Sequence, residues 1–109
     1  MDLDEYQQQS NHTAQYPTLG HAVVYPALGL AGEAGEVVEK IKKVMRNQAG
    51  NFSEMDKQNI AAELGDVLWY LAQISQQLGL SLSEIAYQNL TKLQDRQARG
   101  VIKGQGDKR

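Results

Sequence analysis

Apolar residues recur at three- and four-residue intervals along most of this chain, and that spacing constrains the fold more than any other feature. No segment alternates apolar and polar residues over the length of a β-strand, and both prolines, Pro17 and Pro26, lie in the first quarter. The 109 residues suffice for one domain. We therefore predict a single all-α domain over residues 1–109, a helical bundle of about four helices with its core over about residues 25–97.

Capping residues indicate where the helices begin. A Ser or Asp followed three positions later by an acidic residue marks three expected starts, at Asp2 and Glu5, Ser53 and Asp56, and Ser81 and Glu84. Pro26 is suited to be the first residue of a helix. The expected helices cover about residues 2–14, 26–47, 53–78 and 81–100. The glycine-rich segment 100–109 is expected to be a mobile tail.

Charge and cysteine content exclude several functional classes. The chain carries 11 basic and 13 acidic residues, a net charge of −2, which gives no electrostatic case for a nucleic-acid partner. Without cysteine, the chain has no disulfide, no thiolate catalysis and no sulfur-ligated metal. The acidic first residues do not resemble a signal peptide, and no apolar stretch approaches the roughly 20 residues of a membrane span. We expect a cytoplasmic protein with no membrane partner.

Two similar motifs place paired acids on the second and third expected helices. The sequence E-A-G-E at 33–36 is echoed by E-L-G-D at 63–66. On a helical wheel both pairs fall at the same offset from the apolar stripe of their helix. A short connection makes the two helices antiparallel neighbours. Packing stripe on stripe then brings four carboxylates together at one border of the core, those of Glu33, Glu36, Glu63 and Asp66.

Both apolar stripes are expected to be core. On the second helix the stripe consists of Leu30, Ala34, Val37, Val38, Ile41, Val44 and Met45. On the third helix it consists of Ile60, Leu64, Val67, Leu68, Leu71, Ile74 and Leu78.

Four neighbouring carboxylates repel one another, and partial burial raises the cost. Either some are protonated or a cation lies among them, and oxygen ligands favour Mg²⁺, with Mn²⁺ as a possible substitute. Mg²⁺ usually completes its coordination with water and phosphate oxygens, so the arrangement predicts a phosphorylated ligand. The alternative is a set of solvated surface pairs, such as Glu36–Lys40 and Glu39–Lys43.

The fourth expected helix supplies groups that suit a phosphate chain. Asn89, Lys92 and Arg96 fall inside or beside its apolar face, where polar groups need partners. A phosphate chain would satisfy all three, and so would acids on neighbouring helices. Lys40 and Tyr70 complete the candidate substrate-binding set, although the position of Tyr70 favours a residue that flanks the core over one that contacts a ligand.

A second face of the middle helices suggests self-association. Trp69 lies opposite the apolar stripe, on the face that would meet solvent in a single chain. An exposed tryptophan is uncommon. Gly35 and Gly65 also lie off the stripe, in helix interiors where glycine is unfavourable. We therefore expect another subunit to pack there. Neither acidic pair has a histidine three residues on, which argues against a di-iron site.

The two motifs resemble those of the MazG-like nucleoside triphosphate pyrophosphohydrolases. The pattern E-x-x-E, a spacer and E-x-x-D runs through G-L-A-G-E-A-G-E-V at 29–37 and E-L-G-D-V-L-W-Y-L-A at 63–72, and the likeness covers about residues 25–96. The resemblance implies an all-α bundle assembled as a dimer or tetramer, with hydrolysis of a nucleoside triphosphate to the monophosphate and pyrophosphate. It implies Mg²⁺ held by the four acids, and phosphates bound by Asn89, Lys92 and Arg96, in part across a subunit boundary.

The expected mechanism is metal-assisted hydrolysis at the α–β phosphate linkage. Glu33 and Glu36 are the catalytic candidates, and Glu33 is favoured as the base because its position at the edge of the core raises its pKa. Tyr16, His21 and Trp69 are candidates for stacking on the nucleobase of the substrate. Two alternatives stay open: hydrolysis of phosphoribosyl-ATP, and a non-catalytic helical module that binds a metal or a partner.

Overall fold

Helices form all of the regular secondary structure in the computed structural model, which describes residues 1–101. These are α1 (Leu3–Ser10), the 3-10 helix η1 (Asn11–Thr13), α2 (Val24–Gln48), α3 (Glu54–Gln77) and α4 (Leu82–Ala98). The all-α prediction is confirmed. The expected tail, residues 100–109, lies outside the described residues from residue 102 onward.

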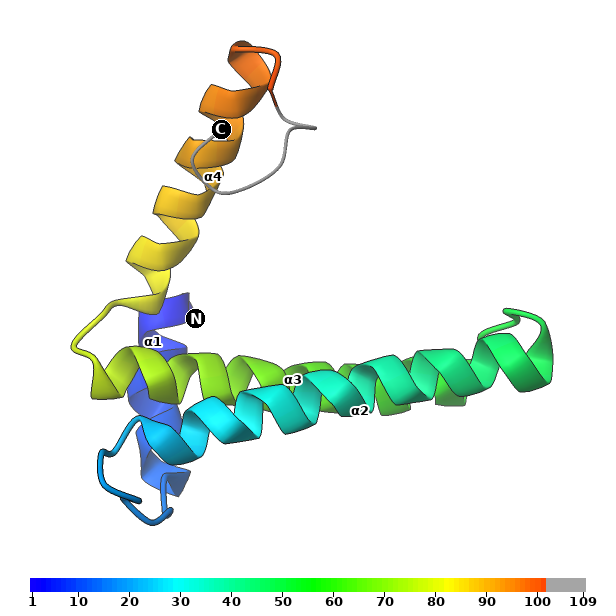
Figure 1. The fold of residues 1–109 in the computed structure, drawn as a ribbon, viewed down its shortest axis with the longest axis horizontal. Helices are drawn as coiled ribbons and strands as arrows, with labels where there is room; N and C mark the ends of the chain where they lie inside the picture. Colours follow the sequence, from blue (N-terminus) through cyan, green and yellow to red (C-terminus); the bar gives the residue numbers. More distant parts are fainter. Residues whose placement is uncertain (102–109) are drawn as a thin grey trace.

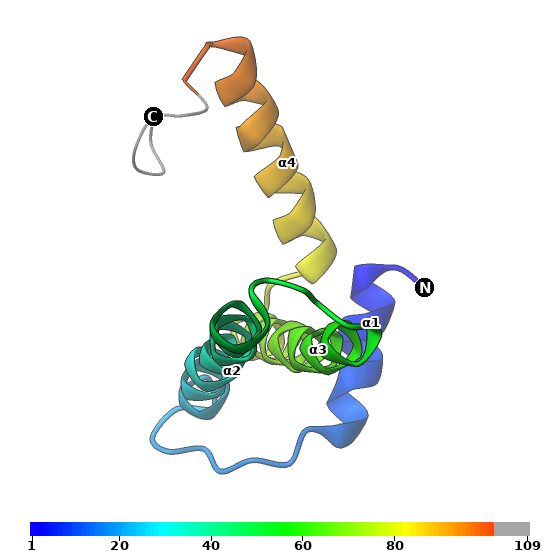
Figure 2. The same cartoon turned by 90° about the vertical axis from the view of Figure 1, so that its right-hand side faces the viewer.

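An antiparallel hairpin of α2 and α3 is the frame of the molecule, as the short connection predicted (Figures 1 and 2). α1 crosses α3 near the end of the hairpin that lies away from the α2–α3 loop. α4 follows α3 after a short turn and points away from the hairpin (Figure 1). No helix within the described residues is long and apolar enough to cross a membrane.

The predicted caps fix most of the helix boundaries. Ser53 and Asp56 form the reciprocal capping box of α3, and the Ser81 hydroxyl accepts a hydrogen bond from the backbone N–H of Glu84. α3 stops at Gly79, whose φ of +68° suits glycine. Pro26 is the third residue of α2 rather than the first. It is tolerated there because the first four N–H groups of a helix have no intrahelical partner.

The first helix is shorter than expected, and it contacts α3 through polar side chains. It ends at Ser10, and η1 follows, so the predicted helix over residues 2–14 is only partly correct. The buried Gln73 amide donates to the Ser10 hydroxyl at 2.8 Å, and Gln7 donates to Gln76 at 3.1 Å. We call this set of contacts between α1 and α3 the polar seam. Hydrogen bonds therefore connect α1 to the hairpin, beside the half-buried side chains of Leu3 and Tyr6.

The same seam positions the start of α4. The buried Gln7 amide also donates to the carbonyl of Leu80 at 2.9 Å and accepts from the N–H of Leu82 at 2.8 Å. Asp4 accepts from the Ser81 hydroxyl at 2.8 Å, and this bond is the main reason that the pKa of Asp4 lies below its usual value. No buried side-chain nitrogen or oxygen in the described residues lacks a partner.

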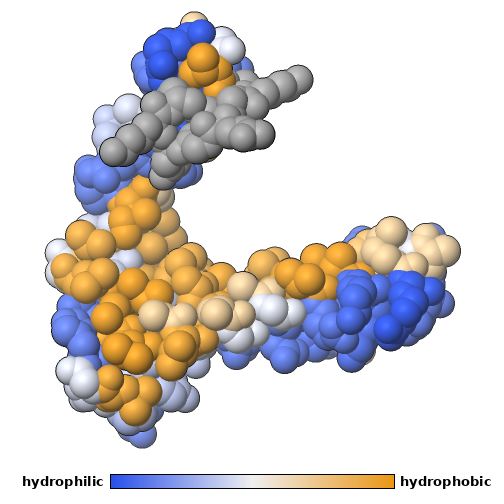
Figure 3. Space-filling model, viewed as in Figure 1, coloured by the Kyte–Doolittle hydropathy of each residue, from blue (hydrophilic) through white to orange (hydrophobic). Residues whose placement is uncertain are grey.

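The predicted apolar stripes are only partly covered within one chain. Val44, Ala72 and Leu82 are the buried hydrophobic residues of the described part. Val38 and Leu64, both expected in the core, are 65% and 51% exposed. A pair of helices can cover only part of each stripe, and α4 does not lie along the hairpin to cover the rest. Figure 3 shows the resulting apolar surface, which continues from the start of α4 along the hairpin.

Candidate functional site

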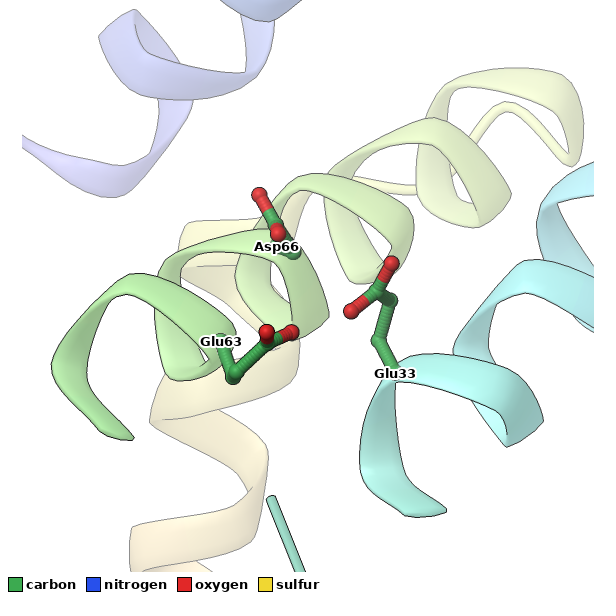
Figure 4. A group of neighbouring side chains, drawn as sticks. All are labelled: Glu33, Glu63 and Asp66. Carbon is green, nitrogen blue, oxygen red and sulfur yellow. The ribbon is translucent and has the colours of Figure 1, made fainter. Parts of the chain in front are cut away.

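Three of the four predicted acids come together between α2 and α3. Glu33, Glu63 and Asp66 each offer a carboxylate oxygen, and these three oxygens lie within 4.8 Å of one another. Figure 4 shows Glu33 reaching from α2 toward the two acids of α3. The antiparallel packing of the hairpin creates this cluster, because it sets the two acidic motifs opposite each other. We call these three residues the acidic cluster.

Crowding within the cluster changes the protonation of Glu33. A hydrogen bond with the Glu63 carboxyl group is the main cause that raises the pKa of Glu33 to about 7. Burial and the charges of Glu63, Asp66 and Glu36 add to the rise. The expected rise is therefore present, although a shared proton contributes more to it than burial does. At pH 7 and without a cation, Glu33 is therefore protonated in about half of the molecules.

Glu36 does not join the three neighbouring oxygens. It lies one turn further along α2, is exposed, and acts on the cluster through its charge alone. The structure thus brings together three of the four acids, and the convergence expected of all four is incomplete. Glu39 pairs with Lys42 at 2.8 Å and Lys43 at 3.7 Å, as a solvated surface residue should.

Lys40 faces the cluster rather than solvent alone. Its amine lies 3.7 Å from a carboxylate oxygen of Glu63 on the neighbouring helix. Lys40 thus contacts the neighbouring helix, whereas the alternative of solvated surface pairs placed it with Glu36. Lys40 therefore supplies one positive charge at the edge of the acidic cluster.

An open hollow adjoins the cluster. It measures about 400 Å³ and is lined by Thr13, Glu33, Asp66, Trp69 and Tyr70. Tyr70, which the sequence left between ligand contact and core, thus borders this hollow. One wall of the hollow carries carboxylates and another carries aromatic rings, a combination suited to a ligand with charged and planar parts.

Gly29 on α2 allows Tyr70 to take this position. A Cβ atom at residue 29 would overlap the Tyr70 ring, so the close approach of ring and helix requires glycine. No such requirement holds at Gly35 or Gly65, where a Cβ would meet nothing within 4 Å. The face that carries those two glycines is open in the single chain.

Trp69 is half-buried by residues of its own chain, and the expectation that another subunit packs on this face stays a prediction. Its indole N–H donates to the Thr13 hydroxyl at 3.0 Å, and the ring of Tyr16 meets it edge-on at 6.2 Å. Tyr16 also stacks on Tyr25 at 5.6 Å. Helical periodicity could not predict this cover, because Thr13 and Tyr16 lie in and beyond a 3-10 turn. His21, the third stacking candidate, accepts a hydrogen bond from the Val23 N–H instead.

The predicted phosphate-binding residues lie on a different part of the molecule. Asn89 and Lys92 border a second hollow, of about 290 Å³, with Ile85 and Gln88. Arg96 is buried further along α4. Because α4 points away from the hairpin, the structure does not bring these three residues to the acidic cluster of the same chain (Figure 1).

The donor set of the cluster fits a hard divalent cation. Carboxylate oxygens are the ligands that Mg²⁺, Mn²⁺ and Ca²⁺ prefer, and the described residues place no histidine or other nitrogen donor among them. The raised pKa of Glu33 also favours a cation at this site. A bound cation would offset the repulsion among the carboxylates that a proton on Glu33 now offsets. The site is therefore suited to hold a cation together with phosphate oxygens.

An all-helical hairpin with a carboxylate cluster between its two helices defines a class of protein suited to divalent cations and phosphate groups. The model of the MazG nucleotide pyrophosphohydrolase domain matches residues 26–101, and the chain belongs to this family. The match includes all four acids and leaves out residues 1–25. The chain is also 44% identical, over 114 aligned residues that cover all of both proteins, to the "Gene 37 protein" of Mycobacterium phage L5. No solved structure gives a significant match.

Proposed function

We propose that this protein hydrolyses nucleoside triphosphates to nucleoside monophosphates and pyrophosphate with Mg²⁺ as its cofactor, and that Mn²⁺ can substitute. The observation that carries the proposal is the group of three carboxylate oxygens within 4.8 Å of one another between α2 and α3. Membership of the MazG nucleotide pyrophosphohydrolase family supports the reaction class. The hollow beside the cluster offers room for the nucleoside.

The acids have distinct roles in this proposal. Glu33, Glu63 and Asp66 hold the cation, which when bound offsets charge on the phosphate oxygens. Glu33 in its ionised form accepts the proton of the attacking water at a carboxylate oxygen as the α–β linkage breaks. Lys40 balances the charge of Glu63 when substrate is absent and contacts phosphate when it is present. Glu36 is the remaining ligand and second catalytic candidate, and must turn toward the cluster to act.

We also propose that the working form is a homodimer or homotetramer. Val38 and Leu64 are more than half exposed in the single chain, although both belong to apolar stripes. A second copy would cover these residues. The α4 helix of that copy would bring Asn89, Lys92 and Arg96 to the phosphates, because the α4 helix of the same chain points away from its own cluster.

The test is a substrate panel assayed with the full chain. Canonical and modified dNTPs and NTPs, together with phosphoribosyl-ATP, are incubated with and without Mg²⁺, and pyrophosphate release is measured. We expect release that depends on Mg²⁺ with at least one nucleoside triphosphate. Activity on phosphoribosyl-ATP alone would show that this compound, and not a nucleoside triphosphate of the panel, is the substrate. No release from any compound would favour a non-catalytic module.

Matched variants locate the activity. Glu63→Ala and Asp66→Ala should each lower kcat/KM at least about a hundredfold, because each removes a group that stabilises charge in the transition state. Glu39→Ala is the control on the same helix pair, since Glu39 forms its ion pairs with Lys42 and Lys43 of its own helix, at the surface. Equal loss in Glu39→Ala, or full activity in Asp66→Ala, would contradict the proposed site.

A further inference from the structure

The hollow beside the acidic cluster has a wall that comes from outside the region matched by the family model. Thr13 belongs to η1, whereas the match begins at residue 26. Trp69 and Tyr70 lie three and four residues after Asp66 on α3, which is about one helical turn, or about 5.4 Å along the axis. A nucleotide whose phosphates lie at the acids would therefore extend toward Trp69 and Thr13.

The orientation of the Trp69 ring depends on Thr13. The Thr13 hydroxyl accepts the indole N–H at 3.0 Å and itself donates to the carbonyl of Ser10 at 3.1 Å. Ser10 is buried and bonded to the fully buried Gln73 at 2.8 Å. A chain of hydrogen bonds thus links the indole to the polar seam. Trp69 is held in one orientation from the N-terminal side.

The neighbouring rings do not stack on the indole. Tyr16 and Tyr70 meet Trp69 with interplanar angles of 84° and 85°. Both contacts are edge-on, so no neighbouring ring among the described residues lies parallel to the indole in the way a stacked base would. Part of Trp69 lines the hollow instead.

We propose that Trp69 is the surface on which the nucleobase stacks, and that Thr13 is a positioning residue that holds the indole in place for it. The inference rests on the proposed function, because it places the phosphates at the acidic cluster. Aromatic side chains bind bases through their faces, and a fixed ring loses less conformational entropy on binding than a mobile one. Preference among bases is then set by the segment that precedes α2, rather than by the matched domain alone.

Trp69 is the single tryptophan of the chain, so its fluorescence reports directly on the proposed contact. The probes are the α,β-imido analogues of the four dNTPs, which resist cleavage at the α–β linkage, and inorganic triphosphate, which has no base. Each is titrated into the full chain with Mg²⁺. We expect the nucleotide analogues to change Trp69 emission with different affinities for different bases. Inorganic triphosphate should bind without that change.

Two variants isolate the role of Thr13. Thr13→Val keeps the branched shape and removes the acceptor of the indole N–H, whereas Thr13→Ser keeps the hydroxyl. We expect Thr13→Val to weaken binding of the preferred analogue about tenfold, to bring the kcat/KM ratios between bases toward one, and to act mainly on KM. Affinity for inorganic triphosphate should not change. Thr13→Ser should retain the preference of the wild type.

The outcomes separate this inference from the proposed function. Suppose that the protein hydrolyses nucleoside triphosphates, but that the nucleotide analogues and inorganic triphosphate change Trp69 emission equally. This result would overturn the stacking surface and leave the proposed hydrolase activity standing. Unchanged ratios between bases in Thr13→Val, with normal thermal unfolding, would overturn the role of Thr13. Selective changes of emission by nucleotides, without hydrolysis of any dNTP or NTP in the panel, would support the base site and refute the hydrolase. If Thr13→Val unfolds, Trp69→Phe must bind triphosphate normally and the analogues more weakly for the inference to stand.

Discussion

Glu33 holds a proton near neutral pH because Glu63 lies close enough to share it. The pKa of Glu33 rises from 4.5 to about 7 on folding without a cation. Between these two values the folded chain binds a proton that the unfolded chain has lost. Stability therefore falls as pH rises through this window, since the unfolded state binds fewer protons.

The proton on Glu33 should make the thermal stability of the protein depend on pH. In the presence of a chelator, the melting temperature of the wild type should fall as pH rises from 4.5 to 7, through loss of the Glu33 proton. Glu33→Gln keeps a hydrogen-bonding group beside Glu63 and removes the titration, so its pH dependence should be shallower. Thermal unfolding followed by circular dichroism at several pH values measures the difference. Parallel curves for the two proteins would contradict the prediction.

A cation should reverse this dependence. Because metal ligands must be deprotonated, Mg²⁺ should stabilise the wild type more above pH 7 than below it. The same series repeated with Mg²⁺ provides the comparison. A stabilisation that is independent of pH would argue against Glu33 as a ligand.

At the scale of single residues, the sequence predicted which acids could meet but not how their side chains pair. The equal offset of Glu33 and Glu63 from their stripes predicted that they meet, and they do, whereas the same argument also predicted that Glu36 joins them, and it does not. Lys40 has several staggered conformers within reach, and it takes the one that contacts Glu63 instead of Glu36. Such choices depend on the facing helix and are not encoded in one helical wheel.

At the scale of elements, the approach of α3 to α2 depends on one glycine. We predict that Gly29→Ala costs about 1–3 kcal/mol, because the added methyl group overlaps the Tyr70 ring. Gly32→Ala, on the same helix with open space around it, should stabilise by about 0.5–1 kcal/mol. Urea unfolding of both variants measures the two free energies. In a Tyr70→Ala background the cost of Gly29→Ala should disappear, and a persistent cost would show another cause.

The junction of α1, α3 and α4 depends on the amide of Gln7. Gln7→Leu leaves the Leu82 N–H and the Leu80 carbonyl without their partner and should cost about 1–3 kcal/mol. Gln8→Leu, at an exposed neighbouring position, should change stability by less than about 0.5 kcal/mol. Hydrogen exchange of the Leu82 amide gives a local measure. Equal protection in Gln7→Leu and wild type would contradict the role of Gln7.

Sequence patterns predicted α2, α3 and α4 better than α1. All three have apolar stripes, and α3 and α4 also have the predicted side-chain caps at Ser53 and Ser81, all of which local chemistry explains. The glutamines at the start of the chain gave no such signal, because a glutamine can be buried only if its partners are in place. Gln7 finds them on α3 and at the start of α4, far away in the sequence.

At the scale of the whole molecule, many large apolar side chains are exposed in the single chain, among them Val38 and Leu64. We predict a molar mass in solution of two or four times the 12.1 kDa of one chain. If α4 of one copy serves the acids of another, Asp66→Ala and Lys92→Ala subunits should each be inactive. Refolded together in equal amounts, they should recover about one quarter of wild-type activity, because half of the dimers then contain one intact site. Pyrophosphate release measures the recovery.

Two results would oppose shared sites. A mixed sample as inactive as its components would show that both residues serve the same subunit. A monomeric mass in an active sample would exclude assembly altogether. The sequence could indicate where apolar residues lie on each helix, but the direction of α4 determines which of them one chain covers.

The polar seam has a consequence for temperature. Contacts between apolar surfaces weaken on cooling, because exposure of apolar groups raises the heat capacity of unfolding. Exposure of amide groups lowers that heat capacity. The first helix is connected in part through glutamine and serine, so cold should loosen the apolar contacts of the hairpin before it releases that helix. The contact between Thr13 and Trp69 that borders the hollow would then persist at low temperature.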